Sequence, residues 1–266
     1  MEGVCTRIIS GSMNKSSKKI TWLHTDIKTN PESFRQFRNI NESINCYKQF
    51  EHIITVSKEA QSSFKEIIGM DATVIPNPID KKDIIEKSQY NSELVKLECQ
   101  FIAIGRLEAV KGFDRLLRVA KHLIEEGYNF NLRIVGEGSL MSQFQAFIES
   151  NSLNNHIHLL GFQSNPYAFL GQSDLLISSS LVEGYPLVII EAMILGIPVL
   201  ATSTAGSIEI LGQDNVIDND EKSLYESLKL MLSDPNILIS MRQKAETFAK
   251  SYDPTYIIKR IEQLLD

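Results

Sequence analysis

The sequence lacks the features that mark nucleic-acid-binding, disulfide-rich and membrane-spanning proteins. Lys and Arg number 27 against 33 Asp and Glu, and the net charge of −6 argues against a nucleic-acid partner. The three cysteines Cys5, Cys46 and Cys99 are odd in number and far apart, which excludes a disulfide framework and favours a reducing compartment. No run approaches the ~20 apolar residues of a membrane span, and the start lacks a signal-peptide pattern. We therefore expect a cytoplasmic protein, with peripheral contact at the inner face of the membrane left open.

Strand-like and helix-like patterns alternate regularly from Cys99 onward. Apolar runs typical of buried strands lie at 101–105, 130–135, 156–160, 174–178 and 197–201, with amphipathic helical spacing between them. This alternation predicts a parallel sheet covered by helices on both faces, with ligands bound at the carboxyl ends of its strands. We expect an α/β fold with a complete Rossmann-like domain over 99–248.

The segment before Pro76 has a shorter α/β pattern. It predicts strands at 6–10, 19–24, 51–57 and 72–75, and helices over 34–50 and 58–68. Two prolines around Asn77 can continue neither a helix nor a central strand, and a charged stretch follows them. We predict a partial N-terminal, acceptor-side Rossmann-like domain over 1–78, a linker over 79–98, and a final helix over 249–266 that packs back toward the N-terminal part.

A loop between a predicted strand and a predicted helix carries two cations. Arg106 and Lys111 flank this loop, and Gly112 opens the helix. A guanidinium fork, an ammonium and the free N–H groups of a helix start are suited to a diphosphate. The alternative is two surface cations beside a glycine cap.

A second motif places two glutamates eight residues apart around a turn. Glu183 precedes the turn, Pro186 marks a helix start, and the N–H groups of Leu187 and Val188 are then free for an anion. Glu191 lies among apolar residues, where a carboxylate needs a partner such as the two hydroxyls of a sugar. The alternative is a solvent-facing Glu on a buried helix.

These motifs, in this order, resemble the group 1 family of retaining glycosyltransferases with the GT-B fold. The resemblance extends from about residue 53 to the end, and more loosely back to residue 19. Its motifs are Gly105-Arg106-Leu107 with Lys111-Gly112, Val135-Gly136-x-Gly138, Leu160-Gly161-Phe162, and Ser180-x-x-Glu183-Gly184-Tyr185-Pro186-Leu187-Val188-x-x-Glu191-Ala192.

The resemblance implies a role for each matching residue. Arg106 and Lys111 would bind the donor's diphosphate, Glu191 the ribose hydroxyls, and Glu183 the hydroxyls of the transferred sugar. His24, at a strand end, would face the donor sugar as a further catalytic candidate, although it can equally be a packed His. The remaining implied donor contacts are Gly105, Gly136, Gly161, Phe162, Gln163, Gly184, Tyr185, Pro186, Leu187 and Val188.

The resemblance also implies the chemistry. Neither a metal nor a cofactor is expected, because the family neutralises the leaving diphosphate with side chains and a helix dipole, and no Asp-x-Asp motif is present. The expected partners are a nucleotide-diphosphate sugar, most commonly a UDP-sugar, and a glycan or lipid-linked acceptor in cell-surface polysaccharide or capsule synthesis. Retention is thought to follow front-face attack, with the leaving phosphate acting as base.

The chain departs from the family pattern before its linker. A full N-terminal Rossmann-like domain of about 150–180 residues is expected, and only the second half of one is recognisable here. We therefore expect an exposed sheet edge and self-association. A donor-binding module without turnover is the main alternative. A dinucleotide oxidoreductase is not supported, because no Gly-x-Gly-x-x-Gly motif follows an early strand of this sequence. A GT-B epimerase would not be expected to carry the two glutamates eight residues apart.

Overall fold

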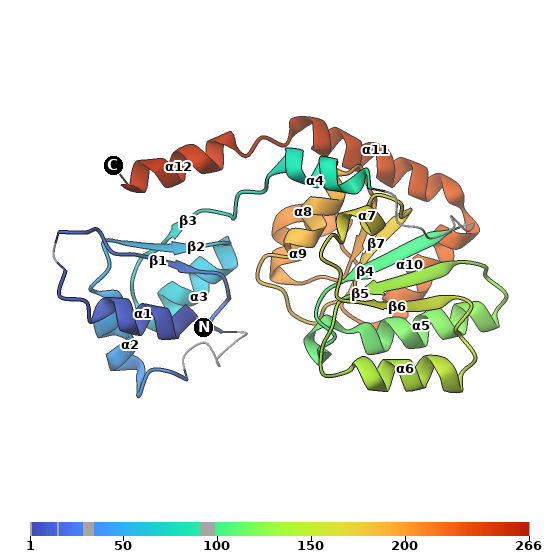
Figure 1. The fold of residues 1–266 in the computed structure, drawn as a ribbon, viewed down its shortest axis with the longest axis horizontal. Coiled ribbons are helices and arrows are strands. Elements are labelled where there is room, and N and C mark those ends of the chain that lie inside the picture. The colour runs from blue at the N-terminus through green and yellow to red at the C-terminus, as the bar shows by residue number, and fades with distance from the viewer. Residues whose placement is uncertain (1, 15, 29–34, 91–98, 266) are drawn as a thin grey trace. The chain divides into compact units, whose positions relative to one another are not determined.

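The computed structural model describes residues 2–14, 16–28, 35–90 and 99–265, and divides the chain into two compact units (Figure 1). Unit 1 comprises Met1–Ile79 and Asp253–Asp266, and unit 2 comprises Asp80–Tyr252. The division thus falls within two residues of the predicted end of the N-terminal domain at 78, and the last residues of the chain return to unit 1.

Unit 1 is a small α/β unit around a parallel sheet in the order β1-β2-β3. Its core is formed by residues such as Leu23, Tyr47, Ile54 and Phe64, with Phe64 fully buried. Ser57 caps one helix through its side chain, and Gly69 ends the same helix at φ 73°. The elements are α1 (Glu2–Ser10), β1 (Ile20–Leu23), α2 (Ile40–Tyr47), β2 (His52–Thr55), α3 (Lys58–Ile68), β3 (Thr73–Val74) and α12 (Thr255–Leu265).

Two sequence predictions for unit 1 are wrong. Residues 6–10 belong to helix α1 and not to a strand, with Thr6 buried against Thr21 and Ile8 70% exposed. Only Ile8 and Ile9 are apolar in this five-residue segment, which is too short for its periodicity to distinguish a strand from a helix. The helix expected over 34–50 is α2 and begins only at Ile40, because Asn39 adopts extended backbone and caps it by accepting from the Glu42 N–H. Residue 34 lies outside the described residues.

Unit 2 contains a five-stranded parallel sheet in the order β6-β5-β4-β7-β8. Its strands are β4 (Gln100–Ile104), β5 (Asn131–Val135), β6 (Ile157–Gly161), β7 (Leu175–Ser178) and β8 (Val199–Ala201). Its helices are α4 (Lys81–Ser88), η2 (Ala109–Lys111), α5 (Phe113–Glu125), α6 (Met141–Ser150), α7 (Tyr167–Leu170), α8 (Leu187–Ile194), α9 (Ala205–Leu211), η3 (Gln213–Asn215), α10 (Glu221–Ser233) and α11 (Pro235–Ser251). The five predicted strands are present, while the short helices α4, α7 and α9 were not predicted.

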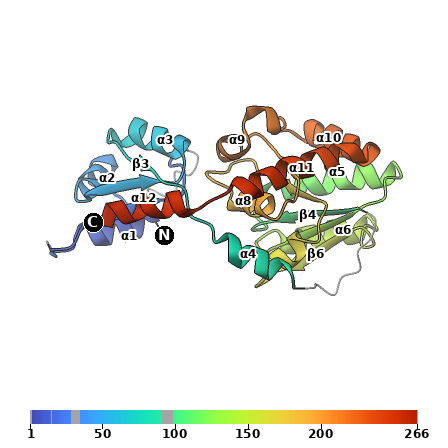
Figure 2. The same ribbon diagram turned by 90° about the horizontal axis from the view of Figure 1, so that it is seen from above.

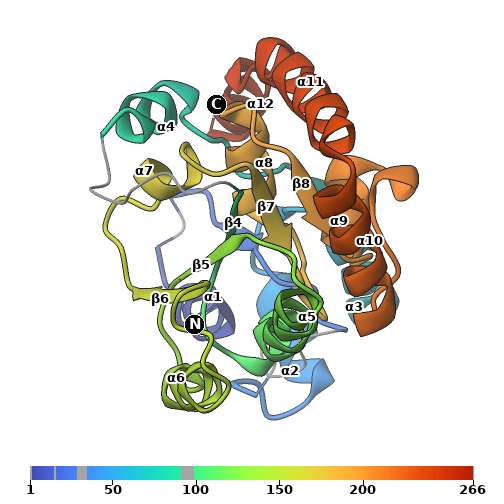
Figure 3. The same cartoon turned by 90° about the vertical axis from the view of Figure 1, so that its right-hand side faces the viewer.

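Helices cover both faces of this sheet (Figures 1 and 3). Apolar side chains of α5, α6 and α10, including Leu116, Phe144 and Leu228, pack on one face. On the other face Leu170 of α7 and Ile189 of α8 pack against the strands. Helix α11 contacts the outer side of α8 (Figure 2). Both sheet faces are therefore buried, which explains why its strands read as continuous apolar runs.

The predicted linker over 79–98 contains a helix and must be corrected. Helix α4 contacts α7 and α8, and it buries Ile84. Asp80 caps it by accepting from the N–H groups of Lys82 and Asp83, and Asn165 donates to the Lys87 carbonyl. The charged composition reflects the solvent side of a helix that belongs to unit 2. Residues 91–98 of the predicted linker lie outside the described residues.

Candidate functional site

The strand order of unit 2 has a switch point between β4 and β7. The chain moves outward from β4 to β5 and β6, then crosses to β7, which pairs with β4 on its other side. The loops that follow β4 and β7 meet at the carboxyl ends of these strands, where the Leu181 N–H donates to the Val110 carbonyl. This end of a parallel sheet is the usual ligand position. The first loop carries Arg106 and Lys111, and the second carries Glu183.

Lys111 and Glu183 form an ion pair across this switch point. The Lys111 ammonium donates to Glu183 Oε1, and both side chains are largely buried, with 19% and 14% exposed. Ser180 Oγ donates to the same carboxylate oxygen at 2.6 Å. Two residues that were assigned to different parts of the donor therefore hold each other, and a bound donor would have to share or displace this contact.

Glycines allow the loops to approach closely. A Cβ added to Gly136, at φ 140°, would lie 1.9 Å from the Gly105 carbonyl oxygen, and one added to Gly138 would lie 2.4 Å from the Leu107 oxygen. A Cβ at Gly112 would lie 2.2 Å from the Ser179 oxygen. The loops after β4, β5 and β7 are thus packed backbone to backbone, which no larger residue permits.

Helix α8 follows the loop after β7, next to the switch point. Pro186 is its N-cap with extended backbone, so the N–H groups of Leu187 and Val188 lie in the first turn, where a helix supplies no acceptor. The Gly184 carbonyl lies against Gly206, where an added Cβ would come within 2.7 Å of it. Burial, followed by the charge of Glu209, raises the pKa of Tyr185 to about 12, so its hydroxyl is a neutral donor at physiological pH. This helix start can accept an anion.

Glu191 has a partner that the sequence reasoning missed. The hydroxyl of Tyr167 on α7 donates to Glu191 Oε1 at 3.1 Å. Burial raises the pKa of the Glu191 carboxyl, and the Tyr167 hydrogen bond offsets this only in part. Its free carboxylate oxygen keeps the capacity to accept from a ligand hydroxyl.

We expect Glu191→Gln to stabilise the fold relative to wild type as pH rises. A raised folded-state pKa means that the native protein binds more protons than the unfolded chain, so stability falls as pH rises from the unfolded-state value toward the folded-state value. The variant cannot lose a proton there, and its free energy of unfolding should fall less between pH 5 and pH 8 in denaturant titrations. Its nucleotide affinity should drop by about 1.5–3 kcal/mol, the range for hydrogen bonds to charged groups. If the free energy of unfolding depends equally on pH in both proteins, the pKa of Glu191 is not raised by folding.

The other predicted donor contacts vary in their surroundings. Arg106 is exposed, and its side chain forms no hydrogen bond or ion pair with any residue that the structure describes. Its charge helps lower the pKa of Glu108, after the larger contributions of Ser139. Gly161 ends β6 at φ 65°, and its carbonyl accepts from the Gly136 N–H. Phe162 is 69% exposed, and Gln163 Nε2 donates to the Leu160 carbonyl. Contact of these four residues with a donor stays a prediction.

His24 lies in unit 1, directly after β1. Its Nδ1 is 3.4 Å from Asn77 Nδ2, and its ring is stacked on Trp22 with 6.1 Å between centroids. His24 is nevertheless exposed, which does not agree with a packed His, and a role toward a donor sugar stays a prediction.

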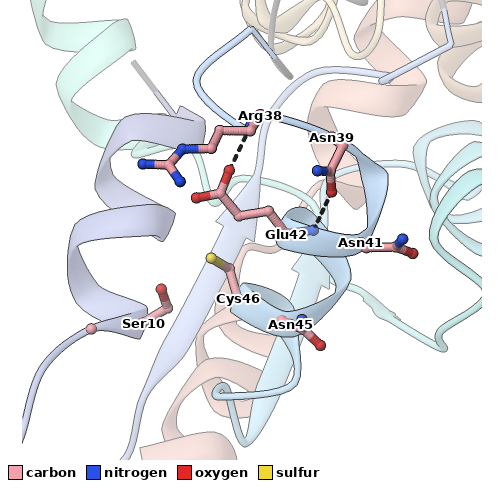
Figure 4. Close-up of a pocket in the computed structure, with 8 residues that line it drawn as sticks. Ser10, Arg38, Asn39, Asn41, Glu42, Asn45 and Cys46 are labelled. Carbon is pink, nitrogen blue, oxygen red and sulfur yellow. Dashed lines mark hydrogen bonds between the residues drawn. The ribbon is translucent and has the colours of Figure 1, made fainter.

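Unit 1 also has a polar hollow of about 430 Å³ between α1 and α2 (Figure 4). Its carboxylate, Glu42, accepts from the Arg38 N–H and pairs with Arg7 at 3.0 Å. The amides of Asn41 and Asn45 also line it. Glu42 is already paired, so the hollow offers amide hydrogen bonds, and the cation Arg38 also lines it.

Two negative findings concern only the described parts of the chain. Residues 2–14, 16–28, 35–90 and 99–265 contain no cluster of three or more His, Cys, Asp or Glu side chains that could hold a metal. No helix within the same ranges is long and apolar enough to cross a bilayer.

Comparison with known proteins adds a family match and relatives. Residues 59–252 match the family described as Glycosyl transferases group 1. An uncharacterized glycosyltransferase of Methanocaldococcus jannaschii is 33% identical over 231 residues, 80% of this chain and 55% of the relative. The Campylobacter jejuni N-acetylgalactosamine-N,N'-diacetylbacillosaminyl-diphospho-undecaprenol 4-alpha-N-acetylgalactosaminyltransferase is 31% identical over 193 residues, 70% of this chain and 51% of the relative. The chain thus spans about half the length of these relatives.

Among solved structures, Anabaena HepE in complex with UDP has a similar fold. Its TM-score is 0.80 at 20% sequence identity, covering 99% of this chain and 76% of HepE. The α/β architecture with parallel sheets is therefore that of the GT-B glycosyltransferases.

Proposed function

The chain belongs to the glycosyl transferases group 1 family, and from this premise we propose that it moves a sugar from a UDP-sugar to a glycan or lipid-linked acceptor with retention of configuration. The proposal includes a role in cell-surface polysaccharide synthesis and catalysis without a resident metal. It concerns the activity of the whole protein, since the relatives are about twice as long as the region matched.

One observation carries the proposal: the Lys111–Glu183 pair lies at the switch point, beside the start of α8. A cation and a helix N-terminus together can hold a diphosphate. A carboxylate that already accepts two hydrogen bonds can also accept from sugar hydroxyls. No described alternative site joins an anion receptor to a buried acid in this way.

The proposed step is a displacement at the anomeric carbon. The bond from this carbon to the diphosphate oxygen breaks, a bond to the acceptor hydroxyl oxygen forms on the same face, and the hydroxyl proton passes to the leaving diphosphate. Negative charge grows on the diphosphate as it leaves. Lys111, Arg106 and the N–H groups of Leu187 and Val188 would stabilise that charge, which is the kind of contribution that lowers a barrier.

The choice of donor and acceptor rests on the relatives. HepE was determined with UDP, and the Campylobacter relative acts on a diphospho-undecaprenol-linked acceptor by its name. Both favour a UDP-sugar and a lipid-linked glycan for this chain.

The donor is tested most directly by thermal shift. UDP at 100 times its dissociation constant should stabilise the fold by about 2.7 kcal/mol, and GDP and ADP at equal concentration should stabilise it less. Arg106→Ala should weaken UDP binding by about 1.5–3 kcal/mol in calorimetry. If none of the three nucleotides raises the melting temperature, the proposed donor site is wrong.

A donor-binding module without turnover is the second candidate. The chain spans about half the length of these relatives, and the residues proposed to bind the diphosphate and the ribose all belong to unit 2. UDP binding combined with neither sugar transfer nor donor hydrolysis would support this reading over the first.

A further inference from the structure

A buried arginine that no motif singled out reaches the loop that carries Glu183. Arg115, the third residue of α5, is 6% exposed. Its Nε donates to the Ser179 carbonyl at 3.0 Å, and its Nη2 contacts the Ser180 carbonyl at 3.1 Å and Asn219 Oδ1 at 2.6 Å. Thr202 Oγ1 lies 3.4 Å from the same nitrogen. The guanidinium therefore binds the loops after β7 and β8 at once.

Asn219 completes this arrangement from the other side. Its Nδ2 donates to the Leu181 carbonyl at 3.1 Å and to the Ser203 carbonyl at 3.2 Å. Together the two side chains bind three successive carbonyls, those of Ser179, Ser180 and Leu181. We call this set of contacts the Arg115–Asn219 clasp. Buried carbonyls need donors, and here two side chains far apart in sequence supply them.

The clasp continues to the ion pair through Ser180. The Ser180 backbone is held by Arg115, and its Oγ donates to Glu183 Oε1 at 2.6 Å. The Ser179 hydroxyl donates to the Lys111 carbonyl at 3.0 Å, and the Leu181 N–H donates to the Val110 carbonyl at 2.8 Å. Both members of the ion pair are thus tied to one rigid segment.

Arg115 has no carboxylate in direct contact among the described residues. Burial lowers its pKa, and the nearby charges of Asp114, Asp220 and Glu221 offset this only in part. A buried cation held by carbonyls is expensive, and an apolar residue of similar length would serve packing alone at lower cost.

We propose that Arg115 is a positioning residue: with Asn219 it fixes residues 179–181 so that Ser180 presents the Glu183 carboxylate to Lys111 and to the donor sugar. The part that concerns the sugar rests on the proposed function. The part that concerns the loop does not.

Hydrogen exchange tests the loop without any ligand. Arg115→Met should speed exchange of the Leu181 amide at least tenfold while amides in the middle of α5 keep their protection. Arg118→Met is the matched control, because Arg118 lies one turn later on α5, is exposed, and pairs only with Asp114 and Glu221. The control should leave Leu181 exchange unchanged.

If Arg115→Met does not fold, two milder variants test the same contacts. Arg115→Lys keeps the charge but loses the fork, and Asn219→Ala removes the amide without adding a group to the core. Each should speed Leu181 exchange several-fold. Unchanged Leu181 protection in both would overturn the clasp.

Calorimetry then separates the clasp from the proposed function. Arg115→Lys should bind free UDP within about twofold of wild type, and should lose several-fold of the extra affinity that a UDP-sugar gains from its sugar. In a Glu183→Gln background the same change should have no further effect, which a general loss of stability would not reproduce. An equal loss in both backgrounds would overturn the proposed action through Glu183. If wild type binds no nucleotide, the proposed function fails, and hydrogen exchange still decides the clasp.

Discussion

Replacing Lys111 with Met should lower kcat/KM for sugar transfer by a factor of about 10²–10³, the loss found when a donor to a developing oxyanion is removed. The variant lacks the charge that would stabilise the leaving diphosphate. It also leaves Glu183, 14% exposed, without its cation and facing an anionic donor. UDP affinity measured by calorimetry should fall by about 1.5–3 kcal/mol. The double variant Lys111→Met/Glu183→Gln should regain part of that binding, because the uncompensated carboxylate is gone.

Lys121→Met is the matched control for this experiment. Lys121 lies on α5 and pairs with Glu125 on the surface, where an ion pair contributes little. Its replacement should leave both transfer and UDP affinity unchanged. Wild-type UDP affinity in Lys111→Met would remove the phosphate role from this residue, whatever happens to turnover.

Replacing Gly136 with Ala should destabilise unit 2 by at least about 3 kcal/mol, near the upper end of single-residue effects. Gly136 has a φ of 140°, and its added Cβ would lie 1.9 Å from the Gly105 carbonyl oxygen. The backbone cannot turn away, because the Gly136 N–H donates to the Gly161 carbonyl and the Gly105 N–H donates to the Val135 carbonyl. Thermal unfolding should show a midpoint lower by about 6–12 °C, at about 2–4 °C per kcal/mol.

Gly127→Ala measures the cost of a positive φ for alanine without the steric clash expected at position 136. Gly127 also has a positive φ, 91°, but an added Cβ there meets nothing within 4 Å. Only the conformational cost of about 1–2 kcal/mol should appear. If the two variants lose equal stability, the close approach of β4 and β5 is not what requires a glycine at position 136.

The fold of unit 2 could largely be predicted because its signals are local. The alternation of buried strands with amphipathic helices such as α5 specifies a parallel sheet. Short elements were not predicted correctly. Helix α7 has four residues, too few for a periodic pattern, and the Ile8-Ile9 pair of α1 suits either a strand or a helix. In α4 the charged surface concealed a buried Ile84.

The sequence predicts a set of candidate donor-binding residues but not the contacts between them. Loop position and residue type identified Lys111, Glu183 and Glu191. Ser180 was part of a motif, but its hydrogen bond to Glu183 was not predicted. Tyr167, the partner of Glu191, and Arg115, which holds the Ser179 carbonyl, are ordinary residue types whose contacts depend on which loops the sheet brings together. The nearest signal was indirect: a buried carboxylate at position 191 requires a donor somewhere in the fold.

The return of α12 to unit 1 has a consequence for synthesis of the protein. Residues Met1–Ile79 are synthesised before unit 2, yet their unit is completed only by Asp253–Asp266, where Lys18 donates to the Leu265 carbonyl at 3.3 Å. Unit 2 is continuous in the chain and can fold before the final helix of unit 1 has been synthesised. A released chain that ends at residue 252 should therefore contain a protease-resistant unit 2 preceded by a protease-sensitive segment.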